Sequence, residues 1–337
     1  MVRDHSRYCF IAFQMVEKLT AEEASDYLTR IHYTGPIETT IDTLSELQRC
    51  HMSAVPFENL SVYGKERITL SKDWLFDKVV RRHRGGFCYE LNTLYSLLLD
   101  YFGFSFKKHS ASVYGGKAGI IGPPLGHHFL MVNIQDDKWM TDVAFGDGYL
   151  MPLRFNAFGE HQEKPSGIYR VRKDEDYYFY EEKIKIKVDE CDREEMPKEK
   201  YTSPGDPLWA IRYGFDLTQR KTEDFKERLE YHQTDAKSPF THDRICTIAK
   251  PWGRLTLTGN RLTSTTYLGN NRVKKEAVEI VGGEEEVVKE LEQKFGVRKE
   301  ACFYPEGSMF HGYKGKSYPT SVKLSGAGKY WPRCILD

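Results

Sequence analysis

One short run combines a cysteine, two glycines and the start of a helical pattern, and it reads Arg84-Gly85-Gly86-Phe87-Cys88-Tyr89-Glu90-Leu91-Asn92. Apolar residues then recur every three or four positions as far as Phe102, which predicts a buried helix that ends at Gly103. Cys88 would lie in its first turn, where free N–H groups and the helix dipole stabilise a thiolate. The two glycines would let a neighbouring chain or a substrate approach the sulfur. A lone cysteine is more often a small buried apolar residue, but this setting favours a nucleophile.

Composition and charge exclude several function classes. The chain has 337 residues, of which 40% are hydrophobic, enough for the cores of two or three small domains. Its 49 basic residues balance 49 acidic ones, so no net charge attracts the whole molecule to nucleic acid or to a membrane. No apolar run approaches the roughly 18 residues that a membrane span needs. Residues 1–18 hold only a brief apolar patch without a signal-cleavage pattern, so we expect a cytoplasmic protein.

The cysteines indicate reduced thiols. They are odd in number, widely spaced and without a Cys-x-x-Cys pair, which argues against a disulfide framework and against a zinc site. No phosphate-binding loop, dinucleotide fingerprint or metal cluster is visible in the sequence. The seven cysteines are Cys9, Cys50, Cys88, Cys191, Cys246, Cys302 and Cys334.

Residues 20–103 are predicted to form one mostly helical unit. Helical patterns cover residues 20–31, 42–52 and 73–82. Glu58 stands among apolar residues between the second and third of these patterns, where a buried carboxylate needs a cationic partner. Arg84 is the candidate partner, and the pair would brace the loop before Cys88. The alternative is a solvated surface glutamate.

After Gly103 the apolar pattern takes the two-residue period of β-strands. We predict a strand over 104–114, a glycine-rich loop over 115–126, and a β-hairpin built from strands 127–134 and 139–146.

The hairpin carries His127 and His128 at the start of one strand and Asp142 on the other. Asp142 lies in an apolar stretch, so its carboxylate needs a partner, and a histidine on the neighbouring strand supplies one. A nucleophile, a base and an orienting carboxylate are then available in the order Cys, His, Asp. The ordinary alternatives are a surface histidine and an aspartate that only forms a turn.

Three runs, residues 55–60, 84–92 and 127–146, closely resemble the arylamine N-acetyltransferases in sequence and in order. The resemblance extends from about residue 27 to about residue 297 and is weaker after Met151. It implies an α+β fold in which an N-terminal helical bundle and a β-barrel form a papain-like core with a C-terminal α/β lid. The expected parts are the bundle over 1–103, the barrel over 104–215, a connector over 216–237, the lid over 238–305 and a flexible extension over 306–337.

The resemblance also implies roles within the site. Cys88 becomes acetylated, Asp142 completes the triad, and the family's catalytic histidine precedes that aspartate by fifteen positions, which selects His127 over His128. Strand parity alone leaves this choice open, because the length of the hairpin loop decides which face opposes the aspartate. Ala144 stands where the family usually has glycine, which would narrow the approach of the backbone there.

The implied activity is transfer of an acetyl group from acetyl-CoA to arylamines, arylhydroxylamines or hydrazines, by a ping-pong mechanism through an acetyl-cysteine. We expect Phe87, Tyr114 and Phe145 to line the amine pocket, with core packing as the alternative for Phe87. Gly122 and Gly126 would offer N–H groups to the CoA phosphates, with an ordinary connecting loop as the alternative.

We expect a monomer without a metal that binds neither nucleic acid nor a membrane. The rival interpretation is a papain- or transglutaminase-like thiol acyltransferase or hydrolase that uses another acyl donor. The runs Arg84-Gly85-Gly86 and Asp142-Val143-Ala144-Phe145-Gly146 favour the acetyltransferase, because those groups do not share them.

The remaining segments are expected to be supporting structure. Alternating lysines at 183, 185 and 187 predict the solvent face of a barrel strand. Residues 238–267 predict strands of the lid, and residues 284–295 predict an amphipathic helix.

Overall fold

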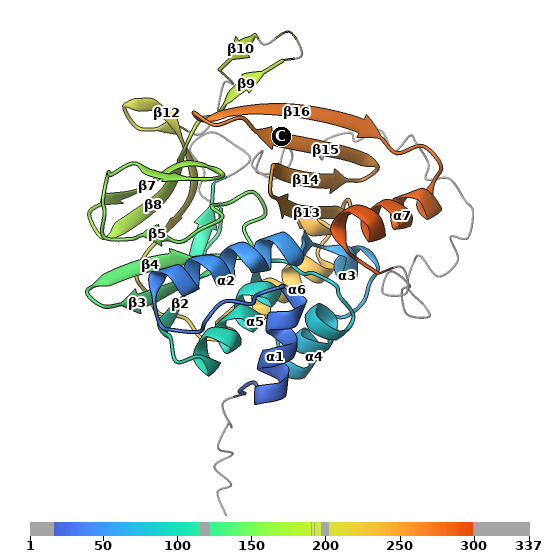
Figure 1. Cartoon of the computed structure of the whole chain (residues 1–337), viewed down its shortest axis with the longest axis horizontal. Helices are drawn as coiled ribbons and strands as arrows, with labels where there is room; N and C mark the ends of the chain where they lie inside the picture. The colour runs from blue at the N-terminus through green and yellow to red at the C-terminus, as the bar shows by residue number, and fades with distance from the viewer. Residues whose placement is uncertain (1–16, 115–121, 190, 192, 197–201, 299–337) are drawn as a thin grey trace, which may run out of the picture.

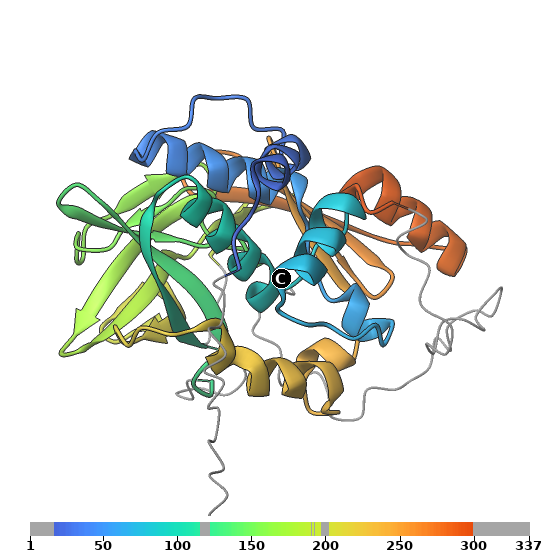
Figure 2. The same cartoon turned by 90° about the horizontal axis from the view of Figure 1, so that it is seen from below.

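The computed structural model describes residues 17–114, 122–189, 191, 193–196 and 202–298 (Figure 1). The N-terminal helices lie below one β-sheet and beside the other in Figure 1, and Figure 2 shows the same arrangement from below. The helical part comprises α1 (Ala21–Arg30), α2 (Ile41–Ala54), α3 (Leu60–Tyr63), α4 (Lys72–Phe76), a π-helical turn η1 (Asp77–Arg81) and α5 (Cys88–Tyr101).

Helix α1 fixes the helical part through its last residue. The helix begins with the predicted capping box, in which Thr20 and Glu23 bond each other's backbone N–H groups. It ends at Arg30, whose buried guanidinium donates to the carbonyl oxygens of Val79 at 2.9 Å and Ala54 at 2.7 Å. Because both carbonyls lie near helix ends that carry partial negative charge, the cation stabilises these ends and ties three elements together.

The first sheet has nine strands and is nearly closed into a barrel. Its order is β5-β4-β3-β2-β12-β8-β7-β6, with β11 added beside β12. Residues on the terminal strands β5 and β6 meet, because Gln162 accepts from the N–H of Arg154 at 2.8 Å and donates to its carbonyl at 2.9 Å. The strands are β2 (Ser105–Val113), β3 (His127–Ile134), β4 (Asp137–Thr141), β5 (Leu153–Arg154), β6 (Gln162–Lys164), β7 (Gly167–Asp174), β8 (Tyr177–Lys183), β11 (Thr202–Ser203) and β12 (Asp206–Phe215).

Aromatic side chains fill the interior of the barrel. They pack mainly in tilted and edge-to-face pairs, for example Tyr180 and Tyr213 with ring centroids 4.8 Å apart. Phe145, three residues after Asp142, belongs to the same cluster, so the barrel core reaches the loop that carries Asp142. The buried aromatic residues are Phe129, Phe145, Tyr149, Phe155, Tyr169, Tyr178, Tyr180, Tyr213 and Phe215.

The second sheet has seven strands in the order β1-β13-β14-β15-β16-β9-β10 and is covered by helix α7 (Glu284–Phe295). Its edge strand β1 (Phe57–Glu58) comes from the helical part, and β9 (Ile186–Val188) and β10 (Glu194–Glu195) follow the barrel strands. The central strands are β13 (Ile245–Lys250), β14 (Gly253–Thr258), β15 (Arg261–Tyr267) and β16 (Arg272–Glu279). The sheet of the lid is therefore assembled from three parts of the chain.

A connector joins the two sheets. It consists of the 3-10 turn η2 (Thr222–Phe225), helix α6 (Lys226–Thr234) and the 3-10 turn η3 (Pro239–Thr241), and it lies beside the N-terminus of α5 through contacts of Phe225 and Phe240 with Tyr89 and Phe87.

The α+β fold with its papain-like core agrees with the expectation, and so do the helix over residues 284–295 and the hairpin of β3 and β4. The second hairpin strand is shorter than predicted. It ends at Thr141, because the carboxylate of Asp142 accepts the N–H of Ala144 at 2.9 Å and Gly146 then takes a φ of +86°. Asp142 therefore lies in a loop directly after the strand. The extension over 306–337 lies outside the described residues.

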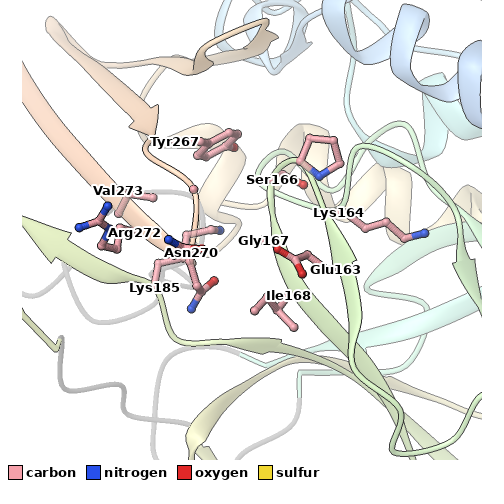
Figure 3. Close-up of a pocket in the computed structure, with 13 residues that line it drawn as sticks. Glu163, Lys164, Ser166, Gly167, Ile168, Lys185, Tyr267, Asn270, Arg272 and Val273 are labelled. Atoms are coloured by element: carbon pink, nitrogen blue, oxygen red, sulfur yellow. The ribbon is translucent and has the colours of Figure 1, made fainter.

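The predicted solvent face of lysines is wrong at Lys185. Strand β8 ends at Lys183 and the chain crosses to β9 in the other sheet, so the alternation of faces stops there. Lys185 lies between the two sheets, paired with Glu182 and with its ammonium 5.8 Å from the ring of Tyr267. Both Lys185 and Tyr267 line a hollow between the sheets (Figure 3).

Within the described ranges, no helix is both long and apolar enough to cross a membrane.

Candidate active site

Cys88 is the first residue of α5 and is almost fully buried, at 4% exposure. The glycines before it permit close packing of the chain on itself. A Cβ atom on Gly85 would lie 1.9 Å from the carbonyl oxygen of Pro56, and one on Gly86 would lie 2.7 Å from a carboxylate oxygen of Glu90. The sequence suggested that a neighbouring chain or a substrate approaches the sulfur, and the structure shows neighbouring parts of the chain packed against the glycines themselves.

The loop before Cys88 is held by the buried pair of Glu58 and Arg84. Arg84 Nε donates to Glu58 Oε1 at 3.0 Å, and the N–H of Gly85 reaches the same oxygen at 3.2 Å. The pKa of Glu58 is lowered, because Arg84 and Lys78 outweigh the effect of burial, which alone would raise it. The contact predicted between Glu58 and Arg84 is present.

A second buried ion pair lies beneath Cys88 and was not predicted. Lys78 Nζ lies 2.6 Å from Glu90 Oε1, and both side chains are fully buried. The other oxygen of Glu90 accepts the N–H of Phe87 at 3.2 Å, at the N-terminus of α5. Lys78 within the apolar helical run before Arg81 was the available signal, because such a lysine needs an internal partner.

His127 faces Asp142, with Nε2 and Oδ2 2.6 Å apart. Burial by itself would lower the pKa of His127, but the charge of Asp142 and hydrogen bonds to Asp142 and Cys88 raise it to about 10. Since Nε2 is bonded to Asp142, Nδ1 is the ring nitrogen left for the thiol of Cys88. The structure thus brings Cys88, His127 and Asp142 together.

His128 is turned away from this group. Its ring packs on Phe225 with centroids 4.6 Å apart, and it is fully buried. Burial lowers the pKa of His128 well below its ordinary value, and the neighbouring Lys108 and His127 add to this effect. His128 is therefore a neutral core residue.

Two amides that sequence reasoning missed hold the Asp142 loop. Asn92 Nδ2 donates to Asp142 Oδ1 at 2.9 Å, and Asn92 Oδ1 accepts the N–H of Val143 at 3.1 Å. Gln48 on α2 accepts from the hydroxyl of Thr141 at 2.6 Å. Asn92 lies one turn after Cys88 on α5, so this helix carries Cys88 and also holds Asp142.

The candidate substrate residues differ in their surroundings. Phe145 packs edge-on against His127 with ring centroids 5.2 Å apart, next to the contact of His127 with Asp142. Phe87 is fully buried and stacks on Phe240 at 5.1 Å, which is the core packing that the sequence left open as its alternative. Tyr114 is partly exposed, and its N–H donates to the carbonyl of Arg212 at 2.9 Å.

The two glycines suggested for CoA follow a segment, 115–121, that lies outside the described residues. The N–H of Gly122 donates to the carbonyl of Val113 at 3.0 Å, so this group is already bonded within the loop and the suggested phosphate contact through it is not supported. A Cβ atom on Gly122 would lie 2.7 Å from the same carbonyl, which explains the glycine. Gly126 stays a prediction.

The described residues contain no cluster of three or more His, Cys, Asp or Glu side chains that could hold a metal ion. Among the cysteines within the described ranges, Cys50, Cys88 and Cys191 are free thiols.

Comparisons with known proteins agree on one family. A family model described as N-acetyltransferase matches residues 40–302. A pineal gland isozyme of arylamine N-acetyltransferase from Gallus gallus is 32% identical over 290 residues, which is 84% of this chain and 97% of the relative. Arylamine N-acetyltransferase 1 of Homo sapiens is 28% identical, over 83% of this chain and 96% of the relative.

Solved structures show the same likeness. An arylamine N-acetyltransferase from Salmonella typhimurium superposes with a TM-score of 0.70 at 26% identity, covering 83% of this chain and 92% of that one. The Mycobacterium marinum enzyme in complex with CoA has a TM-score of 0.69 at 24% identity, covering 83% and 96%, which shows a shared fold.

Proposed function

The chain belongs to the arylamine N-acetyltransferase family, and from this premise we propose that Cys88, His127 and Asp142 form its catalytic triad. The observation that carries the proposal is the position of His127, whose Nε2 lies 2.6 Å from Asp142 Oδ2 and whose ring is close enough to Cys88 for that thiol to raise its pKa. A raised pKa keeps a proton on this imidazole, and an imidazolium beside the sulfur favours an anionic nucleophile.

In the first half-reaction, the sulfur of Cys88 attacks the thioester carbonyl carbon of acetyl-CoA. A new C–S bond forms and the bond to the CoA sulfur breaks. The CoA sulfur takes the proton of His127, and CoA leaves as the thiol. The developing oxyanion would be stabilised by backbone N–H groups in the first turn of α5, among them that of Cys88. Acetyl-Cys88 and a neutral His127 remain.

In the second half-reaction, an aromatic amine or hydrazine attacks acetyl-Cys88. Such amines are largely unprotonated at pH 7, so the nitrogen lone pair is free. His127 takes the proton that the nitrogen loses, the C–S bond breaks, and the imidazolium beside an anionic Cys88 is restored. Asp142 stabilises the imidazolium formed in this step and holds the ring in place.

Phe145 is our candidate for the wall against which a flat amine packs. Its ring is held edge-on to His127 and belongs to the rigid aromatic core of the barrel, so a neighbouring substrate would be oriented without further ordering of this side chain. We also propose that the ring of Tyr114 lines the amine pocket and that Gly126, in the glycine-rich loop, offers its N–H to the CoA phosphates.

The triad alone is compatible with a thiol hydrolase or another acyltransferase, since the same three residue types serve those reactions. The family match over residues 40–302 favours acetyl transfer. We also propose that the enzyme acts in the cytoplasm, because a reducing compartment keeps a nucleophilic thiol free. We further propose that it is a monomer. We retain the division into a bundle over 1–103, a barrel over 104–215, a connector over 216–237 and a lid over 238–305 as a proposal, in which β1, β9 and β10 join the lid sheet from outside the lid's own range.

Intact-protein mass spectrometry tests the covalent step. Brief exposure to acetyl-CoA without an amine should add one acetyl group, about 42 Da, which an added arylamine then removes. Cys88→Ala should remain unlabelled, whereas Cys191→Ser, which removes an exposed free thiol, should be labelled like the wild type. Absence of labelling by acetyl-CoA and by longer acyl-CoAs would contradict the proposed function.

A further inference from the structure

Arg254 of the lid binds the loop that follows Asp142. This arginine comes from β14, is 4% exposed, and donates through Nη1 to the carbonyl oxygen of Gly146. Its Nε lies 3.0 Å from Asp147 Oδ1. One side chain of the lid therefore holds both the backbone and a carboxylate of the loop that carries Asp142.

The same part of the lid also reaches the Cys88 side of the site. Thr247 on β13 pairs with Phe57 on β1, and Phe57 forms a parallel bridge with Gly86, two residues before Cys88. Arg254 Nη1 lies 3.3 Å from the hydroxyl of Thr247. Adjacent strands of one sheet thus contact both loops that carry the reacting groups.

The Asp142 loop has two further anchors of different origin. Gln48 on α2 binds Thr141 and also accepts the N–H of Asp142 at 3.4 Å, and Asn92 on α5 binds the carboxylate of Asp142. These amides hold the start of the loop from the helical part. Arg254 holds its far end, at Gly146, where a φ of +86° bends the chain toward the lid.

Opposite charges strengthen the contact between Arg254 and Asp147. Burial alone would raise the pKa of Asp147, but Lys185, Arg254 and Arg212 together lower it, so this carboxylate is an anion. Lys185 and Tyr267 form one wall of the hollow between the sheets (Figure 3).

We propose that Arg254 is a positioning residue for the acetyl transfer, which couples the lid to the triad by fixing the loop from Asp142 to Asp147. The inference rests on the proposed role of Asp142. Without the guanidinium, the carbonyl of Gly146 loses its charged donor and Asp147 loses its nearest cation. The loop can then shift, and the 2.6 Å contact of Asp142 with His127 loosens.

The protonation of His127 reports this contact directly, because Asp142 is the main group that holds the proton there. The titratable groups that surround His127 are Asp142, Cys88, Tyr213 and His128. None of them is changed in the variants. Loss of the Arg254 cation would by itself raise the pKa of His127, so a lowered pKa reflects a change in geometry.

The test compares Arg254→Met with the matched control Arg261→Met, which removes an exposed arginine from the neighbouring strand β15. Ring-nitrogen NMR of histidine-labelled protein, recorded without substrates, gives the pKa of His127. We expect Arg254→Met to lower this pKa by about one unit or more and the control to leave it unchanged. The rate of acetylation should fall roughly tenfold with little change in KM for acetyl-CoA.

Arg254→Lys keeps the buried charge but cannot reach both Gly146 and Asp147 as a guanidinium does, so its effects should have the same direction and be smaller. If Arg254→Met does not fold, the titration of His127 in Arg254→Lys decides the test. An unchanged His127 titration in the folded variant would overturn the inference. Failure of the proposed function would appear separately, as wild-type protein that acetyl-CoA does not label.

Discussion

Removal of Lys78 alone should destabilise the protein far more than removal of the whole ion pair. Lys78 and Glu90 are 2.6 Å apart and have no exposed side-chain surface. In Lys78→Met the carboxylate of Glu90 keeps the N–H of Phe87 at 3.2 Å and loses its counter-ion. In Lys78→Met/Glu90→Gln the same N–H still has an oxygen acceptor, and neither of the two positions carries a buried charge.

The magnitude follows from this burial. Breaking a buried pair by deleting one partner costs about 3–5 kcal/mol, whereas replacing both partners by neutral groups of similar volume costs about 1 kcal/mol or less. The pair should therefore show a coupling free energy of at least about 2 kcal/mol in a double-mutant cycle.

The loss in free energy of unfolding caused by Lys78→Met should also depend on pH. Burial raises the pKa of Glu90, opposed by Lys78, so without Lys78 the folded state favours the protonated acid more strongly. A carboxyl group whose pKa is higher in the folded than in the unfolded protein stabilises the folded state at pH values below the unfolded pKa. This stabilisation is lost as the pH rises. Lys78→Met should thus lose stability relative to the wild type as the pH rises above about 4.5, by at most about 1.4 kcal/mol per pH unit.

Urea unfolding at several pH values measures these free energies for the four members of the cycle. Lys289→Met, which breaks the exposed pair with Glu286 on α7, is the control and should leave the free energy of unfolding unchanged within error. Additive losses in the double variant, or a deficit of Lys78→Met that does not vary with pH, would refute the reasoning.

Three further changes test the site and the core. Asp142→Asn removes the charge that raises the pKa of His127, so quenched-flow mass spectrometry should show acetylation slowed by roughly a hundredfold or more, and a wild-type rate would contradict the triad. Gly85→Ala places a Cβ 1.9 Å from the carbonyl of Pro56 and should lower the thermal midpoint and the rate together; an unaltered midpoint would show that the loop can adjust. Burial lowers the pKa of His51 to about 3, so the unfolded state binds the extra proton and stability falls as the pH drops from about 6.5; His51→Phe should flatten this dependence in urea titrations, and an unchanged slope would exclude His51 as its source.

The sequence predicted the parts of the site whose signals are local. Cys88 follows two glycines and opens an apolar helix, and the partners His127 and Asp142 lie on one hairpin, where short-range pairing brings them together. The ion pair of Glu58 with Arg84 could also be inferred, because a carboxylate in an apolar run needs a cation.

The remaining parts depend on contacts between distant segments. Gln48 and Thr141 are 93 positions apart, and Arg254 and Gly146 are 108 apart, so no periodicity relates them. Lys185 was assigned to the solvent because alternation in sequence does not reveal that the chain changes sheets after Lys183. Gly122 looked like a phosphate-binding glycine because its bond to Val113 depends on how the loop closes.

The arrangement of buried charge explains why the state of the nucleophile depends on His127. Glu58 is paired with Arg84 in the loop before Cys88, and Glu90 is paired with Lys78 in the first turn of its helix. Each pair is formally neutral, so their fields at the sulfur largely cancel. The imidazole of His127 then decides whether the sulfur has a cation beside it. In the proposed roles Asp142 keeps that proton in place and Arg254 fixes the loop of Asp142, so the barrel and the lid act on Cys88 together with its own helix, whose Asn92 also holds Asp142.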